Sequence, residues 1–276
     1  MSEDEDEGGM LGDFFSKKTH RTPNFEVEAF GRRTISIAQE SRMHLGGRVW
    51  GASVHMLRYF AHSIESSTAC RDLSWHRPTL LELGAGTGLL GIGMALAPSP
   101  APDRRVEVRL TDKADLLPQI EDNIRANLEE DEIGRVAAME LDWMRWEDAS
   151  YWTQGGAGHR AAAGVEVVLA ADCIYFASLY RPFIETLKQI CHINSINASS
   201  GHRRIVCYLC NDDGRTAQNR TSTEPEQHQA GARWDDEFFR LLAADFAFEL
   251  VDADAVLPPG QRNSDMRMYR VWLKSS

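Results

Sequence analysis

The residues with the clearest chemical potential lie in one short stretch, LLELGAGTGLLGIG, at positions 80–93. In it, Glu82 is followed by Gly84, Gly86 and Gly88, which are three glycines at every second position. Glycine adopts positive φ at little cost and lets a ligand approach the backbone closely. The helix expected after this loop would offer unpaired N–H groups in its first turn. These features predict a site for a nucleotide-like ligand at the carboxyl end of a strand in an open α/β sheet.

The spacing of these glycines separates two classes of ligand. A dinucleotide fold places Gly-x-Gly-x-x-Gly directly after the strand, and counted from Gly84 the position of its third glycine is Leu89. The observed order, Glu-x-Gly-x-Gly-x-Gly from Glu82, resembles motif I of class I S-adenosylmethionine (AdoMet) methyltransferases. AdoMet has no pyrophosphate, so such a loop passes beneath a neutral adenosine and an amino-acid tail. We therefore expect AdoMet as the cofactor, with a glycine-rich turn that binds no ligand as the alternative.

A carboxylate follows the next predicted strand. Residues 106–111 (VEVRLT) have a strand pattern and end at Asp112. In this fold an acidic residue at the tip of the second strand holds a ribose diol, because a carboxylate accepts both hydroxyl protons. The alternative is that Asp112 only caps the following helix. After the glycine-rich loop, we favour the ribose role.

A second group of candidate residues follows a later strand, predicted over residues 165–170. The chain continues there as ADCIY (171–175). Ligands of open α/β sheets lie at the carboxyl ends of central strands, so Asp172 and Tyr175 are candidates for the site. Asp172 could instead cap the helix that we expect to begin near Leu179.

Alternating strand and helix patterns position these residues. Two alternating runs within residues 25–38 flank a Gly-Arg-Arg turn and predict a hairpin that covers one edge of the nucleotide fold. The helix predicted over 114–128 buries an apolar stripe and turns its acids and amides to solvent. The fold class is α/β, a Rossmann-like seven-stranded mostly parallel sheet with helices on both faces, preceded by an N-terminal β-hairpin. The predicted strands are 79–83, 106–111, 136–141, 165–170, 205–209, 246–251 and 266–273, and the predicted helices begin near 51, 89, 114, 179 and 234.

Three further segments narrow the family. They are VWGASVHMLRYF (49–60), LDW (141–143) and ADCIY, and with motif I they resemble the family-16 methyltransferases, a group that contains many protein-lysine methyltransferases. The resemblance implies that Asp172 and Tyr175, which match an Asp/Glu-x-x-Tyr/Phe motif, line the channel of the methyl acceptor. It further implies a set of AdoMet-binding residues, Trp50, Glu82, Gly84, Ala85, Gly86, Asp112, Trp143 and Ala171.

The resemblance also suggests how the chain is divided. Residues 1–22 begin with an acidic run that cannot pack, so we expect a disordered acidic tail. Residues 23–276 then form a single AdoMet-dependent methyltransferase domain. Within it we expect polar inserts near 154–164, which is rich in glycine and alanine, and near 211–233, which has few aliphatic residues.

The chemistry of methyl transfer favours an amine as the acceptor. Transfer from a sulfonium is an in-line displacement, in which alignment can contribute roughly 7–11 kcal/mol. The unperturbed pKa of lysine is about 10.4, so its amine must lose a proton first, and an apolar aromatic channel lowers that pKa. Asp172 would orient the amine, and the Tyr175 ring would form a wall with cation–π character. We therefore predict methyl transfer from AdoMet to a protein lysine side chain.

Other functions stay open at this point. Family members often carry a basic residue and a compact helix after the fifth strand, whereas this chain has Asn211-Asp212-Asp213 and a polar stretch. A methyltransferase for another acceptor, such as a protein histidine or a small amine, is therefore an alternative. A non-catalytic AdoMet-binding interaction protein is another. A nicotinamide-dependent oxidoreductase is disfavoured by Leu89 and by the lack of a recognisable acid/base set for hydride transfer.

Charge and cysteine content restrict the partners and the compartment. The net charge of −11 argues against binding of nucleic acid, and no apolar run approaches the roughly 20 residues of a membrane span. The five cysteines are odd in number and scattered, which indicates a reducing compartment. Cys207 and Cys210 would point to opposite faces of a strand, so we expect no metal site. We expect a cytoplasmic monomer, with the nucleus as a second compartment, that acts on a protein with an accessible lysine.

Overall fold

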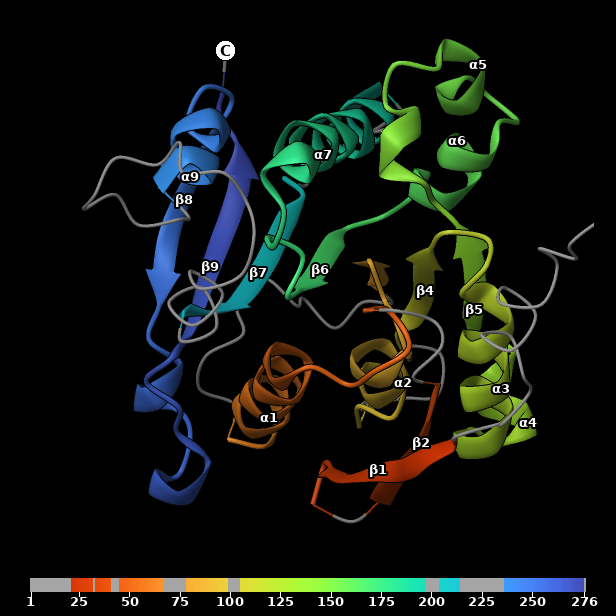
Figure 1. Ribbon diagram of the computed structural model, residues 1–276, viewed down its shortest axis with the longest axis vertical. Helices are drawn as coiled ribbons and strands as arrows, with labels where there is room; N and C mark the ends of the chain where they lie inside the picture. The colour runs from red at the N-terminus through yellow and green to blue at the C-terminus, as the bar shows by residue number, and fades with distance from the viewer. Residues whose placement is uncertain are drawn as a thin grey trace, which may run out of the picture.

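A seven-stranded, mostly parallel sheet organises the molecule (Figure 1). The structure is a computed structural model that describes residues 21–31, 33–40, 45–66, 78–98, 105–196, 204–213 and 236–275. The strand order is β5-β4-β3-β6-β7-β9-β8, and only β9 runs antiparallel to its two neighbours. The strands are β3 (Thr79–Leu83), β4 (Glu107–Asp112), β5 (Val136–Glu140), β6 (Val167–Ala171), β7 (Val206–Asp212), β8 (Phe246–Val251) and β9 (Met266–Leu273). The predicted fold class is confirmed.

Helices cover both faces of this sheet. Helices α1, α2 and α3 pack on one face, and α5, α6, α7 and α9 pack on the other (Figure 1). The α-helices are α1 (Gly51–Glu65), α2 (Leu89–Ala95), α3 (Leu117–Asn127), α4 (Glu130–Ile133), α5 (Ala149–Trp152), α6 (Ala157–Ala162), α7 (Tyr180–Ile196) and α9 (Asp236–Leu242). Short 3-10 turns are η4 (Trp143–Arg145), η5 (Ala177–Leu179), η7 (Ala253–Ala255) and η8 (Pro259–Gln261). None of the helices in the described ranges is long and apolar enough to cross a membrane.

Side chains of the central strands alternate between two hydrophobic cores. On β3, Leu80 belongs to the core beneath α1 and α2, whereas Leu81 belongs to the core beneath α7. This alternation follows from the period of two in a strand, and it requires near-continuous apolar sequence because both faces are covered. Cys207 and Cys210 obey the same rule and lie in different cores, as predicted.

The predicted N-terminal hairpin, β1 (Arg21–Ala29) and β2 (Arg33–Glu40), is confirmed. It packs across the outer side of the α1–α3 layer, not along an edge of the main sheet (Figure 1). The hairpin packs there because it has an apolar face. Val27, Ile35 and Ile37 of this face are buried in the same core as α1 and α2.

The outer edge of β2 is bonded to side-chain amides of α3. Asn127 accepts from the backbone N–H of Ser36 at 2.8 Å and donates to its carbonyl at 2.9 Å. Asn123 pairs in the same way with the backbone of Ala38, at 2.9 and 3.2 Å. The expectation that the amides of this helix face solvent is therefore wrong. A carboxamide carries a donor and an acceptor, so it can replace the neighbour that an edge strand lacks.

Three predicted segments depart from their boundaries. Residues 1–20 of the predicted tail lie outside the described residues, and β1 already begins at Arg21. The insert predicted near 154–164 contains α6, whose Ala161 and Ala162 are buried, because small side chains let this helix pack closely. Asn211 and Asp212 complete β7, Asp213 follows it, and residues 214–233 of the second predicted insert lie outside the described residues. The division into a tail and one domain stays a prediction.

Candidate active site

A cavity of about 610 Å³ opens at the carboxyl ends of β3, β4, β5, β6 and β7. Its volume lies in the range of small-molecule sites. Among the described residues, no group of three His, Cys, Asp or Glu side chains is arranged to hold a metal ion. The structure brings eight of the ten predicted site residues to its walls, namely Trp50, Gly84, Gly86, Asp112, Trp143, Ala171, Asp172 and Tyr175.

The glycine-rich loop after β3 has no room for side chains. Gly84, Gly86 and Gly88 adopt φ of +66°, +56° and +82°, a region that side-chain-bearing residues rarely occupy. A Cβ atom on Gly84 would lie 3.0 Å from Cζ2 of Trp143, and one on Gly86 would lie 3.0 Å from the carbonyl oxygen of Gly46. The positive φ thus favours glycine at all three positions, and close neighbours further exclude a side chain at Gly84 and Gly86.

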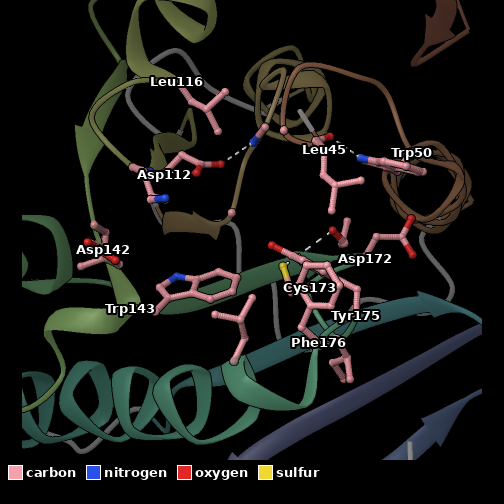
Figure 2. Close-up of a pocket in the computed structure, with 18 of the residues that line it drawn as sticks. Leu45, Trp50, Asp112, Leu116, Asp142, Trp143, Asp172, Cys173, Tyr175 and Phe176 are labelled. Carbon is pink, nitrogen blue, oxygen red and sulfur yellow. Dashed lines mark hydrogen bonds between the residues drawn. The ribbon is translucent and has the colours of Figure 1, made fainter. Parts of the chain in front are cut away.

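Asp112, at the end of β4, faces the pocket beside this loop (Figure 2). One carboxylate oxygen accepts from the N–H of Gly86 and the other from the N–H of Lys113, both at 2.8 Å. Burial raises the pKa of Asp112, and these two hydrogen bonds oppose that shift. Each oxygen of a carboxylate accepts more than one bond, so the group keeps acceptor capacity for a diol.

Trp143 lies beside Gly84 in the same part of the pocket and is positioned by the start of η4. Asp142 caps this turn by accepting from the N–H of Met144 at 3.0 Å. The indole packs edge-on against Phe183, with ring centroids 5.3 Å apart. The two neighbouring tryptophans make contacts elsewhere. The ring of Trp146 lies beneath the guanidinium of Arg181, and Trp152 is buried. Of the three, only Trp143 lines the pocket.

Asp172 lies at the tip of β6 in a left-handed conformation, with φ +56°. Its carboxylate accepts from the N–H of Ala52, in the first turn of α1, at 3.3 Å and from the N–H of Asp212 at 3.1 Å. Asp172 therefore caps α1, not the helix that follows it in sequence. Aspartate tolerates this backbone region better than most residues because its short side chain bonds locally.

Tyr175 lies close to Asp172 on the same side of the pocket (Figure 2). Its ring meets the ring of Phe176 edge-on, with centroids 5.0 Å apart. Burial raises the pKa of the Tyr175 hydroxyl to about 12. The phenol is therefore neutral near pH 7 and offers a ring face and a hydrogen-bond donor.

Residues 30–209 match the sequence model of the lysine methyltransferase family, which is well over half of the chain. The chain belongs to this family. The match confirms the predicted family and, with it, the predicted cofactor, AdoMet.

Individual relatives agree with this assignment. EEF1A lysine methyltransferase 3 of Mus musculus is 31% identical over 159 residues, which is 57% of this chain and 56% of the relative. Protein-lysine N-methyltransferase EFM6 of Saccharomyces cerevisiae is 31% identical over 150 residues, which is 53% and 58%. Protein N-lysine methyltransferase METTL21A of Mus musculus is 27% identical over 169 residues, which is 61% and 66%. Each match spans less than two thirds of the relative's own length.

Two predicted AdoMet residues of this lysine methyltransferase family member lie behind the pocket wall. Glu82 is fully buried, and its Oε2 accepts from the N–H of Gly91 in α2 at 2.8 Å. Burial raises the pKa of Glu82 to about 8, against the effect of that hydrogen bond. Ala85 is also buried, and its N–H donates to the carbonyl of Thr111. Both residues support the loop from behind.

Several lining residues were not predicted from sequence. Gly46 is one, because a Cβ atom there would lie 2.4 Å from Cδ1 of Leu116, and its own carbonyl approaches Gly86. The Gly46-Gly47 pair was a visible signal for such a close approach. Neither Leu45 nor Phe176 carries a sequence signal, because a single apolar residue in a loop is ordinary. The unpredicted lining residues include Leu45, Gly46, Leu116, Cys173, Phe176 and Asn211.

The pocket thus has two sides (Figure 2). Asp112 and Trp143 define a nucleoside side, and Asp172 and Tyr175 define an acceptor side. Cys173 lies between the sides, where its Sγ donates to the carbonyl of Leu83 at 3.1 Å. Burial raises the pKa of this thiol well above its usual value, so it is no nucleophile near neutral pH.

Proposed function

We propose that this protein transfers a methyl group from AdoMet to a lysine side chain of a protein substrate. The observation that carries the proposal is the single cavity in which the glycine-rich loop and Asp112 meet Asp172 and Tyr175. A donor and an acceptor can therefore occupy one enclosed space, as an in-line displacement requires. The names of the three relatives, all lysine methyltransferases, support the same acceptor.

The residues present fit AdoMet. Gly84 and Gly86 leave a surface that a Cβ atom would obstruct, and Asp112 offers carboxylate lone pairs beside it. Trp143 presents an indole next to Gly84 that suits a purine ring. When bound, AdoMet supplies an electrophilic methyl group on a sulfonium.

The acceptor side supplies orientation and desolvation. The Tyr175 ring and the neighbouring apolar wall favour the neutral form of an entering lysine amine. The Asp172 carboxylate accepts an N–H of that amine and so aims its lone pair toward the donor. Neither Tyr175, with a pKa of about 12, nor the buried Cys173 accepts a proton readily near pH 7. No histidine is present among the described lining residues, so the proton leaves to water.

The charge of the pocket favours a cationic acceptor over nucleic acid. Among the described lining residues, Lys113 is the single basic one. Five aspartates line the same cavity, Asp112, Asp115, Asp142, Asp172 and Asp212. Phosphate groups would meet unfavourable charge there, whereas a lysine ammonium would be attracted before it loses its proton. We further propose, as the sequence predicts, that the enzyme is a cytoplasmic monomer.

The test is transfer of tritiated methyl from AdoMet into a cell extract, followed by identification of the labelled amino acid. We expect methyl-lysine in protein with the wild-type chain. Asp172→Asn keeps one acceptor oxygen and tolerates the left-handed conformation, so AdoMet affinity should stay within about threefold while transfer falls at least about 100-fold. Asp122→Asn, which removes an exposed carboxylate of α3 that does not line the pocket, is the matched control and should transfer normally.

The outcomes separate the competing functions. Label on histidine or in small molecules would replace lysine as the acceptor. AdoMet binding without transfer to any acceptor would favour an interaction protein. Unchanged transfer by Asp172→Asn would remove Asp172 from the acceptor site.

A further inference from the structure

Exposed apolar side chains concentrate at the mouth of the pocket. Within the described part of the chain, the large hydrophobic residues at the surface are Leu45, Met144, Tyr175, Phe176 and Leu250, which are 44%, 60%, 36%, 47% and 57% exposed. All except Leu250, on β8, line the pocket. Single exposed apolar residues are ordinary on a protein surface, whereas a group of them marks a contact site.

Three of these residues belong to the acceptor side. Leu45, Tyr175 and Phe176 lie toward Asp172, away from Asp142 and Trp143 (Figure 2). We call these three side chains the apolar rim. Met144 follows Trp143 directly in the chain and belongs to the nucleoside side.

The backbone beneath the apolar rim is held by hydrogen bonds. The carbonyl of Leu45 accepts from Nε1 of Trp50 at 2.8 Å. The carbonyl of Phe176 accepts from the N–H of Leu179 at 2.9 Å, and that of Ile174 accepts from Nδ2 of Asn211 at 2.8 Å. The exposed side chains thus stand on a fixed backbone. A preorganised apolar surface costs little further ordering when a partner binds.

Two carboxylates, Asp172 after β6 and Asp213 after β7, make contacts within the protein. Asp172 accepts two backbone N–H groups, and Oδ2 of Asp213 lies 3.0 Å from Nε of Arg267. The ion pair with Arg267 reduces the attraction of Asp213 for a partner. The two N–H groups that donate to Asp172 are neutral, so they do not cancel its charge, which can attract the lysine amine. The rim beside Asp172 adds apolar surface to this charge.

We propose that the apolar rim is the docking surface for the substrate chain beside the methylated lysine, and that this substrate carries an aliphatic or aromatic residue next to that lysine. The proposal rests on the proposed function and adds the chemistry of the substrate. The occupant follows from continuity, because the rim side chains line the same cavity as Asp172. Consecutive Cα atoms are about 3.8 Å apart, so a chain whose lysine enters the cavity places its neighbouring residues on the rim. Apolar cover would also exclude water and favour the neutral amine.

The test uses pools of short peptides with one central lysine and tritiated AdoMet. In each pool the residue beside the lysine is fixed as leucine, phenylalanine, serine or aspartate. With the wild-type chain we expect the leucine and phenylalanine pools to be methylated at least about tenfold faster than the others, which corresponds to about 1.4 kcal/mol. Phe176→Ser should abolish this preference and leave AdoMet affinity within about twofold, whereas Phe176→Leu should retain it.

Leu250→Ser is the matched control, because it removes an exposed apolar side chain that does not line the pocket, and it should behave as wild type. Equal rates for all pools, or a preference that survives in Phe176→Ser, would overturn the proposal. So would labelling of extract proteins on lysine without labelling of any pool. Failure of the proposed function looks different, because then no lysine is labelled in either the pools or the extract.

Discussion

The nucleoside side of the pocket combines bare glycine backbone with the side chains of Asp112 and Trp143, whereas the acceptor side is formed by side chains. Gly84 and Gly86 present bare backbone at positive φ, and Asp112 is fixed to the same loop by the N–H of Gly86. Across the cavity, Tyr175 and Phe176 project their rings from a short turn after β6. A surface made of backbone has one shape and tolerates few substitutions. A surface made of side chains can change its specificity one residue at a time without altering the fold.

Asp172 has both a role in the acceptor side and a structural role in the backbone around it. It belongs to the acceptor side, yet its left-handed backbone and its bonds to Ala52 and Asp212 fasten α1 to the ends of β6 and β7. A change at Asp172 therefore alters both chemistry and stability. This is why asparagine, which keeps one acceptor oxygen, is the informative substitution there.

The largest effect is expected from Gly86→Ala, which tests whether AdoMet binding depends on the bare backbone of the nucleoside side. Alanine in a left-handed conformation costs roughly 1–2 kcal/mol, and the new Cβ would lie 3.0 Å from the carbonyl oxygen of Gly46. We expect AdoMet affinity, measured by calorimetry, to fall by about 100-fold.

Two other glycines separate the effect of backbone strain from the effect of the close contact made by the new Cβ. Gly164→Ala has the same kind of strain, with φ +79° and no contact within 4 Å, and Gly134→Ala has neither strain nor contact. Gly164→Ala should lose stability but keep AdoMet affinity, and Gly134→Ala should keep both. Equal affinities for all three variants would show that the nucleoside side does not depend on bare backbone.

A smaller effect is expected behind the nucleoside side, at Asn123. Its buried carboxamide bonds to the backbone of Ala38 and donates to the carbonyl of Thr87, in the glycine-rich loop, at 2.9 Å. Asn123→Ala leaves these groups without partners, so we expect a loss of about 2–3 kcal/mol in urea unfolding. Asn24→Ala removes only an exposed bond to Ser36 Oγ and should cost less than about 0.5 kcal/mol. A stable Asn123→Ala would mean that the loop needs no such support.

The next effect is a pH dependence of the folding stability that arises from Glu82. Its pKa is about 8 in the folded chain and near 4.5 when exposed, so between these values the folded protein holds a proton that the unfolded chain has released. The contribution of Glu82 to stability therefore falls as pH rises from about 4.5 to about 8, by at most about 1.4 kcal/mol per pH unit. Glutamine can accept from Gly91 without ionising, so Glu82→Gln should flatten this decline in urea unfolding without AdoMet. Glu121→Gln, an exposed change on α3, should leave the pH dependence as it is.

The smallest effect is expected at the Tyr175 hydroxyl. Because its pKa is about 12, it cannot take the amine proton near neutral pH. Tyr175→Phe should keep kcat within about threefold of wild type and leave the pH–rate profile unchanged, while Tyr175→Ala, which removes the ring, should lower kcat at least about tenfold. A strong loss in Tyr175→Phe would make the acceptor side depend on a polar group, against the apolar character described above.

The nucleoside side was accessible from sequence because its features are local. The positions of Gly84, Gly86 and Asp112 follow from one turn and two strand ends, and glycine spacing reports directly on backbone conformation. The observed boundaries of β3, β8 and β9 are those predicted from sequence. In β3 the signal is a continuous apolar run, since helices cover both faces of the sheet there. In β8 and β9 the signal is an alternation of residue types.

The features missed from sequence depend on contacts between distant segments. Nothing in the sequence indicates that Asp172 caps α1, which lies 120 positions earlier. The amides of α3 match the pattern of a solvated helix face until β2 is placed against them. The apolar rim likewise becomes visible only when Leu45 and Phe176 are brought to one cavity.

The amide contacts between α3 and β2 also have a geometric limit. Four residues of α-helix advance about 6 Å, whereas two residues of a strand advance about 6.8 Å, so the two spacings are nearly but not fully commensurate. Asn127 and Asn123 meet Ser36 and Ala38 in turn, but the next residue, Gln119, reaches Ala38 and Gly47 and not Glu40. The N–H of Glu40 donates instead to the carbonyl of Gly47, at 2.9 Å. The amides of α3 therefore pair with β2 at two alternate residues, and backbone from the segment before α1 replaces them at the end of the strand.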